Sequence, residues 1–333
     1  MTTVEQEEQE EAPAPSGGLG RKILVATLIG ALVFAGLSMY GDVQALRDNL
    51  SAFRWEMLGL AVALATGNYL LRFLRWQYYL TRIGCPTPVG ESFLIFLSGF
   101  VMSVTPGKVG EVFKSLLLLE SQGYSVVKTA PVVVAERLTD LMALVILTAI
   151  GALSFPQGIP ITIAGTALVS LIVAGCAIRP FSEFGFAMAG RMPVIRGLVP
   201  RLREAYESLH SMTRLGPLVY ATLLSTLSWG LEVVGLGVIL SGFDGVSLGW
   251  EATSFAYSAS TIAGALAMMP GGLGVTEAGM TGLLQALGDE SMTPAVATAA
   301  TMLVRLATLW WAVVVGVVAL AAYRRRAKVS EAS

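Results

Sequence analysis

Cations that stand inside otherwise apolar segments are the residues of this chain best placed to do chemistry. Lys108 lies in a Thr-Pro-Gly-Lys turn, and Arg137 and Arg305 lie within long apolar segments. A charge at the centre of a bilayer costs about 2.5–3.5 kcal/mol on insertion scales, so each cation needs an anion, a partner or water. Lysine meets a phosphate as a point charge, and arginine meets it with a planar fork. We therefore expect these three residues to line a central anion-binding cavity.

Carboxylates accompany these cations at five positions: Glu111, Glu136, Asp140, Glu232 and Glu277. Glu136 and Asp140 are four residues apart and so share one face of a helix. Glu111 and Glu277 leave several interpretations open. They could pair with Arg137 and Arg305 and so lock the neighbouring chain, they could cap the helices that follow them, or they could carry a coupling proton.

The segment that must position the lysine is 91–120, which is apolar at both ends and broken in the middle. Pro106 removes a backbone donor, and Gly107 and Gly110 allow backbone conformations that other residues adopt only at a cost. The first arm, residues 91–104, would be roughly 21 Å long as a helix, whereas a bilayer core is about 30 Å thick. The sequence therefore predicts a re-entrant hairpin whose turn lies near the middle of the membrane.

A second broken segment, 253–287, follows the same plan. Its turn begins at Pro270, as the first begins at Pro106, and a glutamate follows each turn. The start of each return arm would offer helix N-terminal N–H groups, which attract phosphate. Two broken apolar segments at matching places are typical of transporters built from internal repeats. The glycines expected beside the bound anion are Gly107, Gly110, Gly271, Gly272 and Gly274.

The composition indicates a polytopic membrane protein, with 54% hydrophobic and 14% charged residues. Two cysteines and one histidine provide no disulfide framework, zinc site or histidine-based triad, and nucleotide-binding patterns are absent. We therefore expect no cofactor, no metal, no catalytic residue and no nucleic-acid partner. The predicted fold is all-α, with two re-entrant helical hairpins in inverted repeats and about six transmembrane helices at 23–40, 57–80, 131–155, 159–178, 217–243 and 294–323.

The charge pattern suggests how the chain is divided and oriented. In order, the predicted parts are an acidic, disordered tail (1–20), a first membrane repeat (21–156), a second repeat (157–323) with an arginine-rich linker (179–215), and a basic tail (324–333). Loops that hold no Lys or Arg are expected outside: 156–158, 242–252 and 288–293. The protein would then lie in the cell membrane with both termini in the cytoplasm.

This topology relates the two halves by inversion in the membrane plane. The first hairpin would enter from the cytoplasm and the second from outside. The spans that follow the hairpins also match, with Arg137-Leu138-x-x-Leu141 against Arg305-Leu306-x-x-Leu309. Broken helices of inverted repeats that meet near the midplane form the substrate site of many secondary transporters.

Two further features are interpreted more simply. Arg72, Arg75 and Trp76, with Tyr78 and Tyr79, are interpreted as an interfacial belt with possible headgroup contacts. The segment 198–209 is predicted to be an amphipathic cytoplasmic helix that joins the halves, with binding of anionic headgroups as the alternative.

Four motifs in order resemble the integral-membrane domain of bacterial lysylphosphatidylglycerol synthases. They are Asn68 with Arg72 and Trp76, Thr-Pro-Gly-Lys-x-Gly-Glu from 105, Glu-Arg-x-x-Asp from 136, and Met-Pro-Gly-Gly-Leu-Gly-x-x-Glu from 269. The resemblance covers about 21–323, and the same domain occurs alone in a family of flippase-like proteins. In the bifunctional relatives the domain is assigned to moving an aminoacylated lipid that a separate cytoplasmic domain makes. That domain has no counterpart after Tyr323, so synthase activity is not expected.

The resemblance implies a lipid translocase rather than an enzyme, with membrane lipids as partners: a phospholipid, a polyprenyl-phosphate or a sugar-lipid. Two alternatives stay open. The chain could be a membrane-embedded transferase that acts on a lipid-linked donor with Glu136 or Asp140 as base, or a non-transporting subunit of a cell-envelope complex. A homo-oligomer is compatible with all three.

Overall fold

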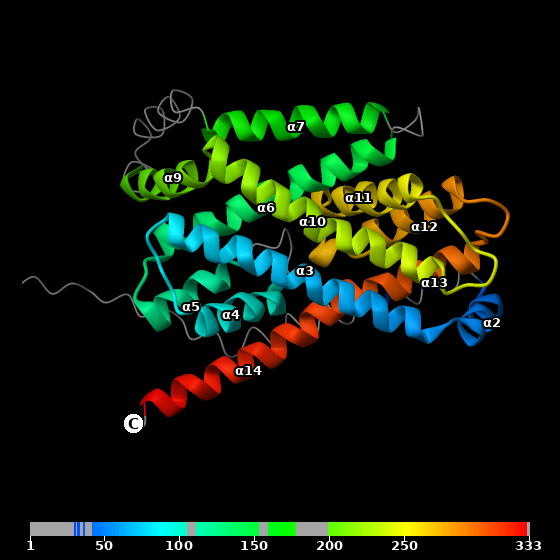
Figure 1. The fold of residues 1–333 in the computed structure, drawn as a ribbon, viewed down its shortest axis with the longest axis horizontal. Helices are drawn as coiled ribbons and strands as arrows, with labels where there is room; N and C mark the ends of the chain where they lie inside the picture. Colours follow the sequence, from blue (N-terminus) through cyan, green and yellow to red (C-terminus); the bar gives the residue numbers. More distant parts are fainter. Residues whose placement is uncertain are drawn as a thin grey trace, which may run out of the picture.

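The computed structural model describes residues 42–104, 111–152, 159–177 and 199–331, together with four positions between 30 and 36. All regular secondary structure in these residues is helical (Figure 1). The prediction of an all-α fold is therefore confirmed for the described part of the chain. Several predicted features lie outside it, namely most of the first span, the tail 1–20, most of the linker 179–215, and the turn that carries Gly107, Lys108 and Gly110.

The helices follow one another with short connections. In chain order they are α2 (Val43–Ala52), α3 (Trp55–Arg82), α4 (Val89–Ser98), η1 (Gly99–Met102), α5 (Phe113–Gln122), α6 (Val126–Ala152), α7 (Ile159–Ala177), α9 (Val199–Thr213), α10 (Leu215–Leu240), α11 (Trp250–Leu266), η5 (Pro270–Gly272), α12 (Val275–Leu287), α13 (Pro294–Arg305), η6 (Leu306–Trp310) and α14 (Trp311–Glu331).

Three of the described helices are long and apolar enough to cross a membrane: α3, α10 and the continuous helix Pro294–Ala327. Such a set of apolar helices belongs to a multi-pass membrane protein. The helix α6 is equally long, at 27 residues, but carries Glu136, Arg137 and Asp140 within its length. The predicted number of six spans stays a prediction.

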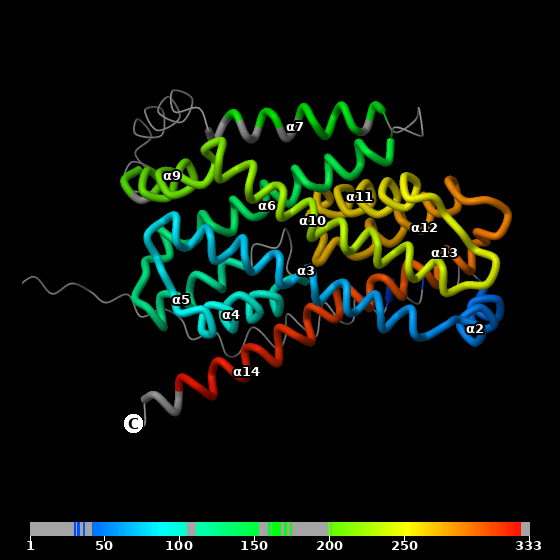
Figure 2. The backbone as a smooth tube through the Cα atoms, viewed as in Figure 1, coloured from blue at the N-terminus to red at the C-terminus, as the bar shows by residue number. Residues whose placement is uncertain are grey.

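Both broken segments form helical hairpins, which lie at opposite ends of the molecule (Figures 1 and 2). In the first, the Gln122 amide at the end of α5 donates a hydrogen bond to Glu91 at the start of α4, 2.9 Å away. This contact brings the two ends of that hairpin together beside the end of α3. The second hairpin, α11 and α12, starts and ends beside the far end of α10. Re-entry of either hairpin into a membrane stays a prediction.

Each hairpin packs against the long helix of the other half. The segment α4–η1 packs on α14, and α11 packs on α6. Glycines make the approach possible, because a Cβ at Gly316 would lie 2.6 Å from the Val101 nitrogen, and one at Gly151 would lie 2.6 Å from the Glu251 oxygen. The helices α3 and α10 pack against each other between these two assemblies. The packing is thus reciprocal, and the inverted repeats stay a prediction.

The structure adds two elements that the sequence did not predict. The helix α2 lies between the first two predicted spans, and the Asp42 side chain at its start accepts a hydrogen bond from the Gln44 nitrogen, 2.9 Å away. The last span is not a uniform α-helix, since residues Leu306–Trp310 form a π-helical turn directly after Arg305. The amphipathic helix predicted at 198–209 is present as α9.

Candidate functional site

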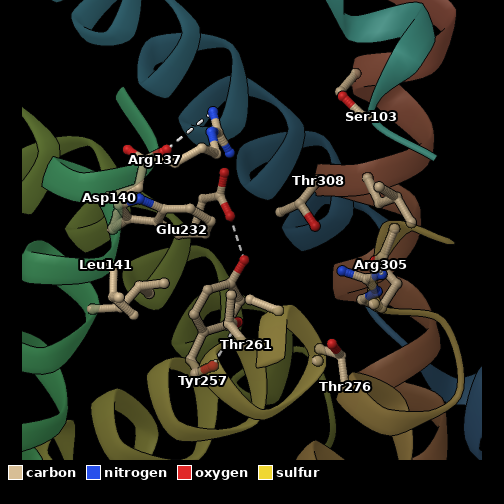
Figure 3. Close-up of a pocket in the computed structure, with 18 of the residues that line it drawn as sticks. Ser103, Arg137, Asp140, Leu141, Glu232, Tyr257, Thr261, Thr276, Arg305 and Thr308 are labelled. Atoms are coloured by element: carbon tan, nitrogen blue, oxygen red, sulfur yellow. Dashed lines mark hydrogen bonds and ion pairs between the residues drawn. The ribbon is translucent and has the colours of Figure 1, made fainter. Parts of the chain in front are cut away.

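A cavity of ≈ 290 Å³ lies between the two hairpins and the long helices of both halves. Figure 3 shows Arg137 and Asp140 of α6 on one side, and Arg305 and Thr308 on the opposite side. Its lining combines charged, aromatic and apolar side chains, including Tyr69, Arg72, Phe100, Arg137, Asp140, Trp229, Glu232, Tyr257, Met268, Met269, Arg305 and Leu309. A mixed lining of this kind suits a ligand with a polar and an apolar part.

Asp140 stands at the centre of a buried ionic cluster on the first-half side of the cavity. It contacts Arg75 Nη1 at 2.7 Å, Arg137 Nη2 at 3.1 Å and Arg72 Nη2 at 3.5 Å. The Ser225 hydroxyl of α10 also donates to it, at 3.2 Å. Asp140 therefore compensates arginines from α3 and from its own helix, which is the condition for keeping such charges out of water.

Glu136, one turn earlier on α6, is fully buried and contacts Lys114 as well as Arg75. Lys114 Nζ on the return arm donates to it at 2.5 Å, and Arg75 Nη2 lies 3.9 Å away. Lys114 also lies 4.5 Å from the centre of the Trp76 ring, within range of a cation–π interaction. The first hairpin is thus attached to α6 and α3 by charge.

Glu111 and Glu277 each pair with the arginine that the sequence suggested. Arg137 Nη2 donates to Glu111 at 3.0 Å, and Arg305 Nε donates to Glu277 at 2.6 Å. Glu277 also accepts a hydrogen bond from the Gly274 nitrogen, at 2.6 Å, so it caps α12 as well as pairing. For Glu277, both pairing with the arginine and capping of the helix are therefore confirmed.

A further carboxylate, Glu232 of α10, lines the cavity between Arg137 and Arg305. The Tyr257 hydroxyl of α11 donates a hydrogen bond to it (Figure 3). Nearby, the Tyr69 hydroxyl donates to the Thr308 carbonyl in the π-helical turn, at 3.0 Å. The two tyrosines therefore connect α3 and α10 to the second hairpin and to the last helix.

The tips of the two hairpins meet at the edge of the cavity. A Cβ at Gly271 would lie 3.6 Å from the Cα of Val104, the last described residue before the first turn. Gly271, Gly272 and Gly274 have φ angles of 61°, 71° and 86°, a region that glycine enters at little cost. Gly271 also accepts a hydrogen bond from Arg305 Nη2, at 2.7 Å. The second turn thus needs its glycines for shape, and its carbonyl holds an arginine.

The interfacial interpretation of Arg72, Arg75 and Trp76 is wrong. Arg75 and Trp76 have no exposed surface, and Arg72 is 8% exposed. The two arginines turn inward because Asp140 and Glu136 of α6 offer them carboxylates. The tryptophan packs on the first hairpin, where its ring nitrogen donates to the Ser92 hydroxyl at 3.1 Å.

The family described as the lysylphosphatidylglycerol synthase TM region matches residues 23–316 of this sequence. The chain belongs to this family. Membership relates it to membrane proteins concerned with lipids. No curated protein sequence gives a significant match.

The matched range contains all the charged residues described above, so the ionic clusters belong to the family domain rather than to an appended segment. Asn68, one of the motif residues, donates from its side chain to the Ser228 carbonyl at 2.8 Å and so ties α3 to α10. Sequence reasoning missed Tyr69, Tyr257 and Thr308. Only their packing around Glu232 and the π-helical turn brings them together, and no spacing in the sequence signals it.

Proposed function

We propose that this protein is a lipid translocase that moves a phosphate-bearing lipid across the cytoplasmic membrane. The observation that carries the proposal is the cavity between two oppositely placed hairpins, lined by Arg137 from one half and Arg305 from the other. Cations facing a common cavity from both repeats can hold one anionic headgroup as it passes between the two sides. The proposed cargo class comprises phospholipids, polyprenyl-phosphates and sugar-lipids.

The size of the cavity limits what can enter. A volume of ≈ 290 Å³ lies at the lower end of the range for small-molecule sites, about 300–1,000 Å³. It accommodates a headgroup but not the chains of a lipid, so the chains would stay in the bilayer. Lys108, on the turn of the first hairpin, would add a third cation. Since the sequence has no nucleotide-binding pattern, movement would be downhill or coupled to an ion.

Charge at the two ends of the molecule supports the proposed orientation. The ends of α3, α9 and α14 gather at one end, where the chain carries Arg82, Arg214 and Arg324–Arg326 (Figure 1). The opposite end carries acidic residues, among them Asp42, Asp244 and Asp289. By the positive-inside rule the basic end, with the C-terminus, would face the cytoplasm.

The test is a transport assay on the purified protein in proteoliposomes with fluorescent phosphatidylglycerol, in which a membrane-impermeant quencher reports the lipid on the outer face. The parent protein should equilibrate the lipid between leaflets. Lys108→Ala should abolish this without lowering the melting temperature, and Lys128→Ala, away from the cavity, should behave as the parent.

The transferase alternative is tested in the same vesicles by searching for a covalent product from candidate lipid-linked donors. A product without lipid movement would replace the proposal. Neither product nor movement would leave a supporting subunit of a larger complex as the better account.

A further inference from the structure

One edge of the cavity is both apolar and exposed, unlike its buried charged wall. Leu266, Met268 and Met269, at the tip of the second hairpin, line the cavity with exposed fractions of 60%, 59% and 42%. Arg305 and Glu232, on the inner wall, are 8% and 6% exposed. The tip is therefore the mouth through which the polar interior reaches the outer surface of the protein.

The backbone at this mouth holds a methionine in a costly conformation. Met268 has a φ of 54°, in the left-handed region, where a residue with a Cβ loses roughly 1–2 kcal/mol relative to the usual helix. Glycines occupy the positive-φ positions that follow at 271, 272 and 274, but not this one. A strained residue that keeps a large, exposed side chain at a cavity mouth points to a binding role for that side chain.

The chemistry of the mouth identifies the part of the ligand that it contacts. Methionine is unbranched and flexible, and it adapts to apolar partners without demanding one shape. The contiguous charged wall behind it would hold an anionic headgroup. An amphiphile whose headgroup lies in the cavity must pass its hydrocarbon chain through this edge.

We infer that Leu266, Met268 and Met269 form a binding site for a hydrocarbon chain of the lipid, at a lateral portal between the cavity and the bilayer. The inference rests on the proposed function for the identity of the ligand. It goes further in assigning the portal to the tip of the second hairpin. Transport of lipids with different headgroups would share this contact, because the site recognises only the chain.

The first experiment locates the chain directly. The full-length protein is placed in phosphatidylcholine vesicles that contain a trace of phosphatidylglycerol with a diazirine in one acyl chain, and labelled peptides are quantified after illumination. The control surface is α14, where Val314, Val317 and Val318 are 51%, 45% and 64% exposed. Labelling of residues 264–276 above that of α14 is expected. Equal labelling would mean that the tip meets only bulk lipid, and the inference would be overturned.

The second experiment uses matched variants in the transport assay. Replacing Met268 and Met269 together by serine should slow transport by about tenfold, the factor that corresponds to the loss of one well-packed apolar contact. Replacing Val317 and Val318 by serine should change the rate by no more than about twofold. Equal rates for both variants would also overturn the inference. Selective labelling of the tip by a parent protein that moves no lipid would instead sink the proposed transport while leaving the chain site in place.

Discussion

In each half, a glutamate of the hairpin pairs with an arginine of the helix that follows, but the surroundings of the two ion pairs differ. In the second, Arg305 is held by Glu277 and by the Gly271 carbonyl, and Glu277 also caps α12. In the first, Glu111 contacts both Arg137 and Lys114, at 3.0 and 3.9 Å. The Glu277–Arg305 pair therefore stabilises a single turn. The Glu111–Arg137 pair belongs to an ionic network that includes residues of α3, α5 and α6.

Exposure separates the two arginines further. The Arg137 side chain is 25% exposed and the Arg305 side chain is 10% exposed. Arg137 also has a second carboxylate, Asp140, within 3.1 Å. Arg137, with two carboxylate partners and open surface, can therefore move toward a ligand. Arg305, held by Glu277 and the Gly271 carbonyl, would meet the same ligand from a fixed position. The comparison teaches that a repeated motif need not repeat its role.

The largest effect is expected at the centre of the first-half network. Asp140→Asn leaves Arg75, which has no exposed surface, with two hydroxyl partners and a carboxylate 3.9 Å away, and it removes a charge partner from two more arginines. Loss of one partner from a buried ion pair costs roughly 3–5 kcal/mol, so a large fall in melting temperature is expected. Asp244→Asn, on the loop after α10, is the control. A parent-like melting temperature for Asp140→Asn would contradict the network.

The next prediction compares the two glutamates. Glu277→Gln removes the one carboxylate that pairs with Arg305 among the described residues and weakens a helix cap, so it should cost roughly 3 kcal/mol. Glu111→Gln should cost only about 1–2 kcal/mol, since Arg137 keeps Asp140 and Lys114 keeps Glu136. Thermal unfolding of both variants measures the difference. If Glu111→Gln were the less stable variant, the Glu111–Arg137 pair would be the one without alternative partners, contrary to the structure.

Replacing Arg137 should affect transport more than stability, whereas replacing Arg305 should have a large effect on stability. Arg137→Ala should lower the transport rate by at least about tenfold. It should lower the free energy of unfolding by only about 1–2 kcal/mol, because Asp140 keeps Arg75 and Arg72 and the buried Glu111 keeps Lys114, 3.9 Å away. Arg305→Ala leaves Glu277, which is fully buried, without its cation and should destabilise the protein strongly. Arg137→Lys, which keeps the charge, serves as the conservative variant and should recover part of the rate. If Arg137→Ala transports at the parent rate, Arg137 does not hold the headgroup.

The smallest effect concerns the connection between α3 and the first hairpin. Cys85 is buried there, and burial raises the pKa of its thiol. At neutral pH less thiolate is present than on an exposed cysteine, so maleimide should react slowly. With Cys176 replaced by serine, Cys85 should resist labelling in the native protein, whereas an added cysteine at the exposed Thr81 should react. Rapid reaction of Cys85 would show that this end of the hairpin is open.

The sequence sufficed for features that depend on local chemistry. Proline and glycine marked both hairpin turns, apolar length marked α3 and α10, and charge arithmetic named the pairs Glu111–Arg137 and Glu277–Arg305. Those pairs could be named because an isolated buried charge is too costly to leave without a partner. The turn that carries Lys108 lies outside the described residues, so its role stays a prediction.

Other features depend on tertiary packing and left no local signal. Arg72 and Arg75 beside aromatic residues look the same in sequence whether they face headgroups or a buried carboxylate. Only the packing of α3 on α6 decides that Asp140 receives them. The sequence likewise does not signal the π-helical turn after Arg305, because a change in helical register has no characteristic composition. Its effect, a carbonyl of Thr308 turned to Tyr69, is visible only in three dimensions.

The reciprocal packing of the hairpins imposes an order on the making of the protein. The first hairpin is complete at Gln122, yet the surface that receives it lies around Gly316 on α14, the last of the described helices in chain order. At about 5–20 residues per second, the hairpin waits on the order of ten seconds or more for that helix. During this interval its buried Lys114 already has Glu136 of α6 and the Trp76 ring of α3 as partners. The ionic contacts with α6 and α3 therefore hold the first hairpin in position while the chain is still being synthesised, as well as in the folded protein.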